Sequence, residues 1–414
     1  MSEERLNMPI WCKGGMVLLL LLQIGACIAG ARPSLTGNID FRAFYAAGSI
    51  VRTGEGSRLY DYAYQQHIQD TIVSFRVAPL PFLYPPFAAL WFVPLSLLSY
   101  RNAFFVQLAI NLALLWGTAA TLRATVPSAR ARSALLLPSL YGCCFCVSIA
   151  LMQGQVSFLL LFICSCAYCA LRRGSDYTAG ATLCLLLVKF QLALPILVLF
   201  FCWKRWRLIW GFATGSAVLG LISWCVVGTG GLRTYARSVF DVGSLVSSDA
   251  SAAKARYGMF PRDMPNLHGL TFGLSGGAEW GVALNFMLCA LVFYYAWRYG
   301  RSSLLVALPA AMLVSYHMQP HDLVLLLLPI TVALGPHLNG RCNPEDSKIR
   351  LYSAIVLLSF LVLPFAAVLM AYSLNFLVAI AVAGVMLHWM RFPGSTHLLF
   401  RAELETGHSQ GTRE

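Results

Sequence analysis

Charged side chains are scarce in this sequence. Only 11% of the 414 residues are Asp, Glu, Lys or Arg, whereas a soluble globular domain carries roughly 25%. Hydrophobic residues make up 58% of the chain, and the mean hydropathy is +0.68. So little polar surface cannot cover a water-soluble particle, which excludes a soluble enzyme and a disordered chain. The composition predicts a polytopic integral membrane protein.

Acidic residues are scarcer still, with 17 Asp and Glu against 30 Lys and Arg, so the formal net charge is +13. Such an excess is also typical of nucleic-acid-binding proteins. Here, however, the basic residues stand in short clusters between apolar runs, which is the pattern of the cytoplasmic ends of membrane spans. We therefore expect no nucleic-acid partner.

Several signatures of metal-dependent chemistry are missing. No residues have convincing zinc spacing, no glycine-rich loop could cradle a phosphate, and the Asp-x-Asp pattern of soluble glycosyltransferases is absent. A nucleotide-sugar donor is therefore disfavoured, and we expect neither a metal nor another cofactor. Cysteine is abundant, but most of the 13 cysteines lie inside apolar runs, where a cysteine behaves as a small hydrophobic residue; examples are Cys143, Cys144, Cys146, Cys164, Cys166 and Cys169.

The apolar runs predict about 11–13 membrane helices. The first run, Gly14–Gly30, approaches the ~20 residues that a span needs and has no cleavage site, so we expect an uncleaved helix with the N-terminus inside. Further spans are expected at about 83–99, 103–122, 133–150, 155–171, 178–203, 208–228, 280–298, 303–316, 322–335, 351–372 and 373–390. Full crossings at both 83–99 and 103–122 would leave Arg123, Arg130 and Arg132 outside, so one of these segments is re-entrant or wrongly bounded.

Basic clusters set the expected orientation in a cell membrane. The cytoplasmic clusters are Arg172/Arg173, Lys204/Arg205/Arg207, Arg298/Arg301 and Arg341/Lys348/Arg350. The extracytoplasmic segments are then a first loop (31–82), Gly154–Gln155, a second large loop (229–279) and the stretch from His317 to Asp322. We expect one integral membrane domain over residues 1–400, followed by a cytoplasmic polar tail (401–414).

The first loop has amphipathic periodicity. Phe41, Phe44, Tyr45, Gly48 and Val51 recur at helical spacing after Asp40, and a second helix is predicted from Asp61 with Tyr64, Ile68, Ile72 and Phe75 on one face. Two such helices after a span are expected to lie at the membrane surface. In 178–203, the basic flanks at both ends favour two half-helices that meet near Lys189 over a single crossing.

Two residues have competing interpretations. Asp40 at the membrane interface could act as a general base toward a hydroxyl, or it could simply cap the helix that follows. Lys189 lies deep in an apolar run, where a charge is costly unless it is paired or faces a cavity. It could meet a lipid phosphate, or it could extend toward an interface.

Other polar residues allow further alternatives. His321 and Asp322 open a late span, where they could bind or relay a proton, or the aspartate could cap the helix. His317 and His268 are weaker candidates of the same kind. Arg42 and Arg52 could bind phosphate or extend to the headgroups.

Together, several short motifs resemble glycosyltransferase family 87, whose members are membrane transferases of the C-type superfamily that use polyprenyl-phosphate-linked sugars. The resemblance covers about residues 15–390. Its motifs are Asp40-Phe41-Arg42-Ala43-Phe44-Tyr45-Ala46-Ala47-Gly48, Leu59-Tyr60-Asp61, Tyr84-Pro85-Pro86-Phe87, Gly154-Gln155-Val156-Ser157, Ala179-Gly180 with Lys189 and Pro195, Lys204-Arg205-Trp206-Arg207, Asn266, and His321-Asp322.

The resemblance implies an all-α C-type glycosyltransferase fold and an inverting transfer of a hexose, commonly mannose, with Asp40 as the base. It implies a pocket for the polyprenyl phosphate that opens to the extracytoplasmic face, with Arg42, Lys189 and His321 stabilising the phosphate. The residues expected to bind substrate are Arg42, Tyr45, Tyr60, Tyr84, Gln155, Lys189, Asn266, His268, His321 and Asp322. The family pattern has a serine soon after the asparagine, but here Asn266 is followed by Leu267 and His268.

The expected partners are a polyprenyl-phosphate sugar donor, a glycan or glycolipid acceptor, and the lipids of a bacterial plasma membrane. Two other functions fit the sequence. One is a transporter or flippase of a lipid-linked or small anionic substrate, although such a protein is expected to show repeats and ionisable residues at the membrane midplane. The other is a non-catalytic partner in an envelope complex, in which replacement of Asp40 would be tolerated.

Overall fold

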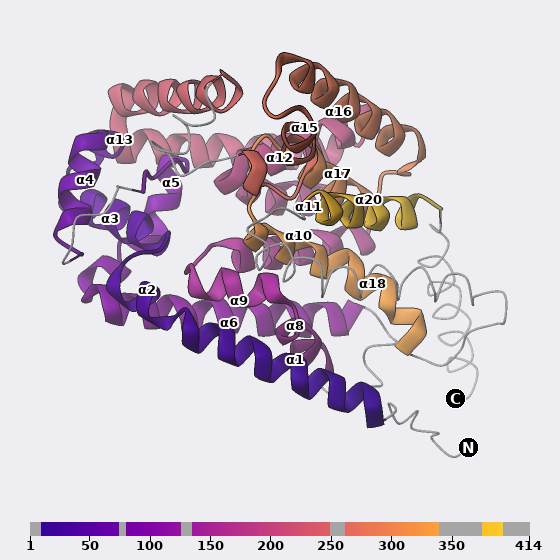
Figure 1. Ribbon diagram of the computed structural model, residues 1–414. Coiled ribbons are helices and arrows are strands. Elements are labelled where there is room, and N and C mark those ends of the chain that lie inside the picture. Colours follow the sequence, from indigo (N-terminus) through magenta and orange to yellow (C-terminus); the bar gives the residue numbers. More distant parts are fainter. Residues whose placement is uncertain (1–9, 74–79, 126–134, 249–260, 339–374, 392–414) are drawn as a thin grey trace, which may run out of the picture.

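The computed structural model describes residues 10–73, 80–125, 135–248, 261–338 and 375–391, and these residues form helices and no strands. Arg130 and Arg132, the cluster Arg341/Lys348/Arg350, the predicted span 351–372 and the tail 401–414 lie outside the described residues. The α-helices and 3₁₀-helices (η) are α1 (Ile10–Ala29), α2 (Ala31–Thr36), α3 (Phe41–Arg52), η1 (Gly56–Arg58), α4 (Tyr62–Asp70), α5 (Pro86–Ala89), η2 (Leu90–Phe92), η3 (Leu95–Leu97), α6 (Tyr100–Thr125), α8 (Leu136–Gly142), α9 (Phe145–Met152), α10 (Ser157–Arg172), α11 (Asp176–Leu183), η4 (Cys184–Lys189), α12 (Phe190–Cys202), α13 (Trp206–Ser248), η5 (Pro261–Asp263), α15 (Leu267–Ser275), α16 (Glu279–Tyr299), α17 (Leu304–Val314), η6 (Pro320–Leu326), α18 (Leu327–Leu338) and α20 (Asn375–Arg391) (Figure 1).

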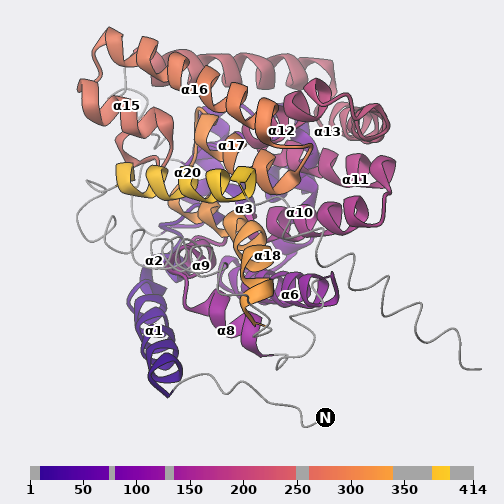
Figure 2. The ribbon, with the colours of Figure 1, turned by 90° about the vertical axis from the view of Figure 1, so that its right-hand side faces the viewer.

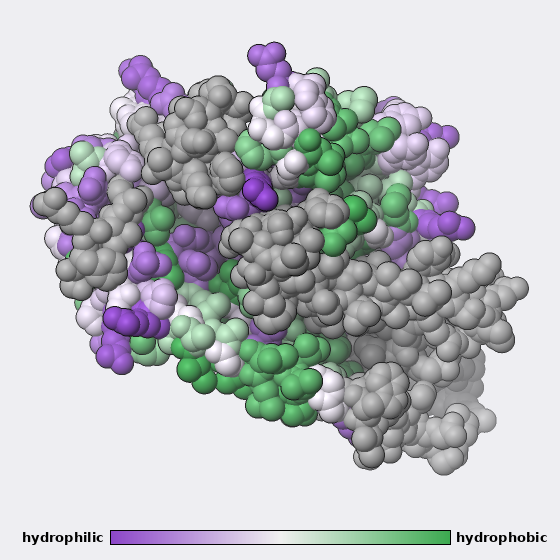
Figure 3. All heavy atoms as spheres, viewed as in Figure 1, coloured by the Kyte–Doolittle hydropathy of each residue, from purple (hydrophilic) through white to green (hydrophobic). Residues whose placement is uncertain are grey.

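The prediction of an all-α polytopic membrane protein is confirmed. Five helical segments of the described chain are long and apolar enough to cross a membrane, namely Lys13–Arg52, Tyr100–Arg123, Asp176–Cys202, Trp206–Val242 and Glu279–Tyr299. Helix α1 lies at the periphery of the molecule (Figure 2). Its exposed surface is apolar (Figure 3), and Leu18, Leu21 and Ile28 are each at least 60% exposed. A lipid environment accounts for such a surface.

The segment 83–99 is not a membrane span. It consists of α5, η2 and η3, with four, three and three residues, and Pro94 separates the last two. Proline cannot donate the backbone hydrogen bond that a continuous helix requires. Because only α6 is then a crossing in this region, Arg123 lies at the end of α6 opposite to the first loop. This correction removes the conflict in the predicted topology.

Two neighbouring helices, α6 and α10, end in basic residues on the same side of the bundle. Helices α6 and α10 run in the same direction. Asn111 of α6 donates a hydrogen bond to the carbonyl of Gln155, just before α10, and further along both helices Gly117 lies against Phe162. Their last turns, which carry Arg123 and Arg172, therefore share one side of the bundle.

The segment 176–205 forms a re-entrant hairpin. At its two ends Arg205 pairs with Asp176 through both carboxylate oxygens, over 2.5 and 2.9 Å. At its tip Lys189 has non-helical dihedral angles, φ −121° and ψ 75°, and separates η4 from α12. The prediction of two half-helices that meet at Lys189 is therefore confirmed.

Helix α11 approaches α13 so closely that a Cβ atom at Gly180 would lie 1.9 Å from the carbonyl oxygen of Leu208.

Much of the predicted second loop is helical. Helix α13 bends sharply at Gly228, whose φ of 66° and ψ of −179° favour glycine. Residues 229–248 continue as a second helix, which lines an apolar cavity together with the first half of α13. Helix α15 follows within the same predicted loop, before α16.

Helix α3 departs from the predicted surface location. Most of its residues are buried, including the charged Arg42 as well as Phe41 and Phe44. It packs against α4, α6, η2 and η3, so protein rather than lipid covers both of its faces. In Figure 1, α3, α4 and α5 gather at one end of the molecule.

The core lies among α9, α10, α17 and η6. Every residue of α17 from Leu304 to Leu313 is buried, as is all of η6. The cysteines of α9 and α10 contribute to this core as predicted, with Cys146 and Cys164 fully buried and free of disulfides.

Candidate active site

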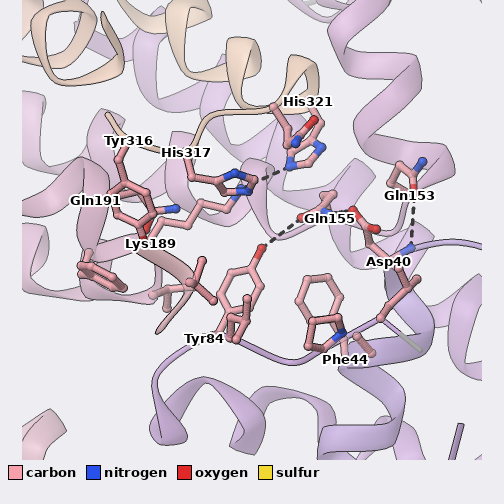
Figure 4. A pocket seen from close by; sticks show the side chains of 18 of the residues that line it. Asp40, Phe44, Tyr84, Gln153, Gln155, Lys189, Gln191, Tyr316, His317 and His321 are labelled. Atoms are coloured by element: carbon pink, nitrogen blue, oxygen red, sulfur yellow. Dashed lines mark hydrogen bonds between the residues drawn. The ribbon is translucent and has the colours of Figure 1, made fainter. Parts of the chain in front are cut away.

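A polar pocket of about 250 Å³ lies where the first loop, the turn before α10, the tip of the hairpin and the turn before η6 meet (Figure 4). These four segments are far apart in the sequence. The polar residues that line the pocket are Asp40, Tyr84, Gln153, Gln155, Lys189, Gln191, Tyr316, His317, Gln319 and His321. Of the eleven residues predicted to form the site, five line this pocket. A sixth, Asp322, is hydrogen-bonded to Lys189, which lines it.

Asp40 does not cap its helix. It holds the N-cap position of α3 but has helical dihedral angles and makes no side-chain capping bond. In contrast, Asp61 accepts a hydrogen bond from the backbone of Tyr64 and caps α4 in the usual way. The Asp40 carboxylate instead accepts a hydrogen bond from Gln155 Nε2 at Oδ2, over 2.5 Å, and faces the pocket. This geometry disfavours the capping interpretation.

The turn Gln153-Gly154-Gln155 holds Asp40 in place. Gln153 accepts hydrogen bonds from the backbone nitrogens of Asp40, through its side chain, and of Phe41, through its carbonyl, each over 3.1 Å. Gln155 Oε1 accepts a hydrogen bond from the hydroxyl of Tyr84 over 3.4 Å, so one amide connects Tyr84 with Asp40 (Figure 4).

Lys189 is paired at the tip of the hairpin. Its ammonium donates to Asp322 Oδ1 over 2.5 Å and lies 3.2 Å from His321 Nε2. The side chains of Lys189 and Asp322 are only 4% and 1% exposed. Asp322 also accepts hydrogen bonds from Ser157 Oγ and from the backbone nitrogen of Gln319, both over 3.2 Å. A pair with such support can hold a charge inside a membrane protein.

Lys189 does not extend toward an interface, since its ammonium is fixed at the pocket wall. The lysine ammonium has three protons, and the described residues offer it the two contacts above. A third proton therefore remains available for a ligand in the pocket.

The turn from Ser315 to Gln319 brings His317 to the pocket. Burial, together with the neighbouring Lys189, lowers the pKa of His317 to about 4, so the imidazole is neutral at physiological pH. Among the described residues its buried Nδ1 has no hydrogen-bond partner. A neutral imidazole with an unused nitrogen can bind a hydroxyl or a phosphate oxygen.

Asn266 and His268 support this turn from outside the pocket. Asn266 Nδ2 donates to the carbonyl of Ser315 over 2.5 Å, and its Oδ1 caps α15 by accepting from Gly269 N. His268 Nδ1 lies 3.0 Å from the carbonyl of Tyr316, and burial lowers the pKa of His268. Both side chains are therefore engaged with the backbone.

Three more predicted substrate-binding residues lie outside the pocket. Arg42 is buried and does not line the pocket, and it interacts electrostatically with Tyr100, Asp70 and Asp40. The hydroxyl of Tyr45 donates to the carbonyl of Leu98. The hydroxyl of Tyr60 donates to the carbonyl of Tyr84 over 2.7 Å, so Tyr60 contributes indirectly by holding Tyr84.

The sequence interpretation missed Gln153, Gln191 and Gln319. Gln153 stands two residues before Gln155, and Gln191 two residues after Lys189, so each accompanies a predicted site residue. The sequence signal that could have indicated them is a polar residue at or next to a break between apolar helices. Side-chain amides suit the recognition of sugar hydroxyls because they donate and accept hydrogen bonds.

Two apolar cavities adjoin the pocket. One, of about 400 Å³, shares Tyr84 and Val188 with the pocket and is lined by Phe87, Trp91 and Leu159, among others. The second, of about 430 Å³, shares Phe190 and Val239 with the pocket and lies between the two halves of α13. The polar pocket can thus receive a head group while an attached apolar chain occupies a neighbouring cavity.

No cluster of three or more His, Cys, Asp or Glu side chains suited to a metal ion occurs in the part of the chain that the structure describes. The polar groups that line the pocket comprise one carboxylate, one ammonium, two imidazoles, two phenol hydroxyls and several amides.

The fold and the pocket define a helical membrane protein with a polar pocket beside two apolar cavities. The profile of glycosyltransferase family 87 matches residues 82–329 of this sequence. The chain belongs to this family, as its motifs predicted.

Two curated relatives have the same name, polyprenol-phosphate-mannose-dependent alpha-(1-2)-phosphatidylinositol pentamannoside mannosyltransferase. The protein from Mycolicibacterium smegmatis is 30% identical over 229 residues, which cover 54% of this chain and 52% of the relative. The protein from Mycobacterium tuberculosis is 34% identical over 103 residues, covering 24% of this chain and 22% of the relative. The chain thus matches about half the length of the first relative and less than a quarter of the second. No solved structure matches the chain significantly.

Proposed function

We propose that this protein transfers mannose from a polyprenyl-phosphate-linked donor to a hydroxyl of a glycan or glycolipid acceptor, at the extracytoplasmic face of a bacterial plasma membrane. The observation that carries the proposal is the pocket, in which the Asp40 carboxylate and the Lys189 ammonium line the same space beside two apolar cavities. Membership of family 87 and the names of the two relatives support the choice of donor.

In the proposed reaction, Asp40 accepts the proton of the acceptor hydroxyl as that oxygen attacks the anomeric carbon. The bond between the anomeric carbon and the phosphate oxygen breaks, and the electron pair leaves with the polyprenyl phosphate. Because attack and departure occur on opposite faces of the sugar, the configuration at the anomeric carbon inverts.

Negative charge grows on the departing phosphate. The remaining proton of Lys189 can meet this charge in a buried site, where such contacts are stronger than in water. His317 and His321 can add hydrogen bonds to the phosphate. Arg42 has no such role in this mechanism, because it lies outside the pocket.

The test is transfer of radiolabelled mannose from a polyprenyl-phosphate donor in membrane vesicles. General base catalysis contributes about 10²–10⁴-fold, so Asp40→Asn is expected to lose at least about 100-fold in rate. Asp61→Asn is the matched control, since Asp61 also begins a helix of the first loop but lies outside the pocket. It is expected to retain transfer.

Full transfer by Asp40→Asn would refute Asp40 as the base. Vesicles that move the labelled donor across the membrane without transferring its sugar would support the transporter or flippase function instead.

A further inference from the structure

The carboxylate of Asp40 is oriented by one short turn. Three hydrogen bonds join Asp40 and Phe41 to residues 153–155, and one of them, from Gln155 Nε2 to Oδ2, reaches the carboxylate itself. In the described chain no hydrogen bond is made to Oδ1 of Asp40. The turn therefore occupies one carboxylate oxygen and leaves the other for the pocket.

The orientation of the Gln155 amide follows from its neighbours. An ionised carboxylate only accepts hydrogen bonds, so the nitrogen of the amide must face Asp40. The amide oxygen then faces Tyr84, whose hydroxyl donates to it. A rotated amide would place two acceptors together at Asp40 and leave the Tyr84 hydroxyl without its acceptor.

The backbone of Gln155 is fixed as well. Its carbonyl accepts a hydrogen bond from Asn111 Nδ2 of α6 over 3.1 Å, and Asn111 in turn accepts from Gln107 over 3.2 Å. Asn111 and Gln107 are almost completely buried. Buried polar networks of this kind fix the positions of their members when every member is satisfied.

Gly154 allows the turn to approach Asp40. Its φ is +63°, and a Cβ atom there would lie 2.8 Å from Cβ of Phe41. Any larger residue would push the turn away from α3. Gly54 also has a positive φ, +80°, but a Cβ atom there would meet nothing within 4 Å.

We propose that Gln155 is a positioning residue, which holds Oδ2 of Asp40 so that Oδ1 points into the pocket as the proton acceptor. This inference rests on the proposed function, because it assigns a task to the base of that reaction. Gln155 acts through Asp40 and does not need to contact the substrate.

The experiment compares wild type with Gln155→Met in the vesicle assay, over a pH range and a range of donor concentrations. Methionine has a similar length but cannot donate to the carboxylate. We expect kcat to fall by about tenfold, the KM for the donor to change by less than about twofold, and the acidic limb of the kcat profile to move up by about one pH unit, because a hydrogen bond that favoured the ionised base has been lost.

Gly154→Ala and Gly54→Ala form a second, matched pair. Both place alanine at a positive φ, which costs each of them similar backbone strain, but only the first displaces the turn from Asp40. We expect Gly154→Ala to lower kcat by about tenfold and Gly54→Ala to leave it unchanged.

The outcomes separate the two proposals. An unchanged acidic limb and kcat in Gln155→Met, with active wild type, would overturn the positioning role alone. A rise in KM with unchanged kcat would assign Gln155 to substrate binding instead. Wild-type vesicles without transfer would refute the proposed function itself.

Discussion

The ion pair between Lys189 and Asp322 allows stability and activity to be separated. Removal of one member of a buried pair costs about 3–5 kcal/mol, because the other charge remains buried without compensation. In Lys189→Met the Asp322 carboxylate would keep two hydrogen bonds, from Ser157 and Gln319. In Asp322→Leu the ammonium would keep only the contact with His321.

We therefore expect a cost of about 3 kcal/mol for Lys189→Met and about 5 kcal/mol for Asp322→Leu, the two ends of that range. In the double variant no buried charge remains, and replacement of a buried pair by hydrophobic residues of similar volume is often neutral or stabilising. The double variant should thus be more stable than either single variant. It should nevertheless lose transfer, because the charge that meets the phosphate is gone.

Thermal unfolding of the detergent-solubilised proteins, followed by the loss of the monodisperse species, measures the stability. The vesicle assay measures transfer. A double variant as unstable as Asp322→Leu would show that the two residues are not energetically coupled. A double variant that transfers mannose at the wild-type rate would show that Lys189 has a structural role only.

Two smaller predictions follow from the surroundings of the pocket. Tyr60→Phe removes the hydrogen bond that holds the backbone of Tyr84. It should lower kcat by about threefold, because a lost hydrogen bond of this kind is expected to raise the activation free energy by roughly 0.5–1 kcal/mol. Tyr45→Phe is the control, since it removes a comparable hydrogen bond outside the pocket, and equal losses of kcat in both variants would contradict this reasoning. Because the pKa of His317 is about 4 in the fold and about 6.5 when unfolded, the unfolded chain binds more protons between these values. Stability should therefore decrease as the pH falls from about 6.5 toward about 4. His317→Asn should reduce this decrease in thermal unfolding, and an identical decrease would argue against a neutral His317.

The sequence predicted those parts of the site that local patterns encode. The break at Lys189 follows from the basic flanks of its segment, and the start of a helix after Asp40 follows from the spacing of Phe41 and Phe44. These patterns left open whether the Asp40 side chain caps the helix. The carboxylate is instead bonded to Gln155, 115 residues away in the chain, and lines the pocket.

Residues on the same helix turn as Asp40 show the limit of such patterns. Arg42 and Tyr45 belong to the motif of Asp40, yet neither lines the pocket, and the hydroxyl of Tyr45 is bonded to the carbonyl of Leu98. Helical periodicity gives the face on which a residue lies but not what packs against that face. Similarly, hydropathy predicted a span over 83–99, whereas the segment forms three short helices, the last two separated by Pro94.

The hairpin of residues 176–205 sets the depth at which sugar transfer would take place. At about 1.5 Å per residue, the 13 residues of α12 raise Lys189 about 20 Å above the Asp176–Arg205 pair. With the Asp176–Arg205 pair at one surface of a hydrocarbon layer of about 30 Å and α12 along the membrane normal, the ammonium would lie about 10 Å beneath the opposite surface. In the proposed reaction, an acceptor would then have to bring its hydroxyl below the headgroups, whereas a lipid-linked donor would need only a small displacement. The length of α12 would in this way favour membrane-anchored sugars over free ones.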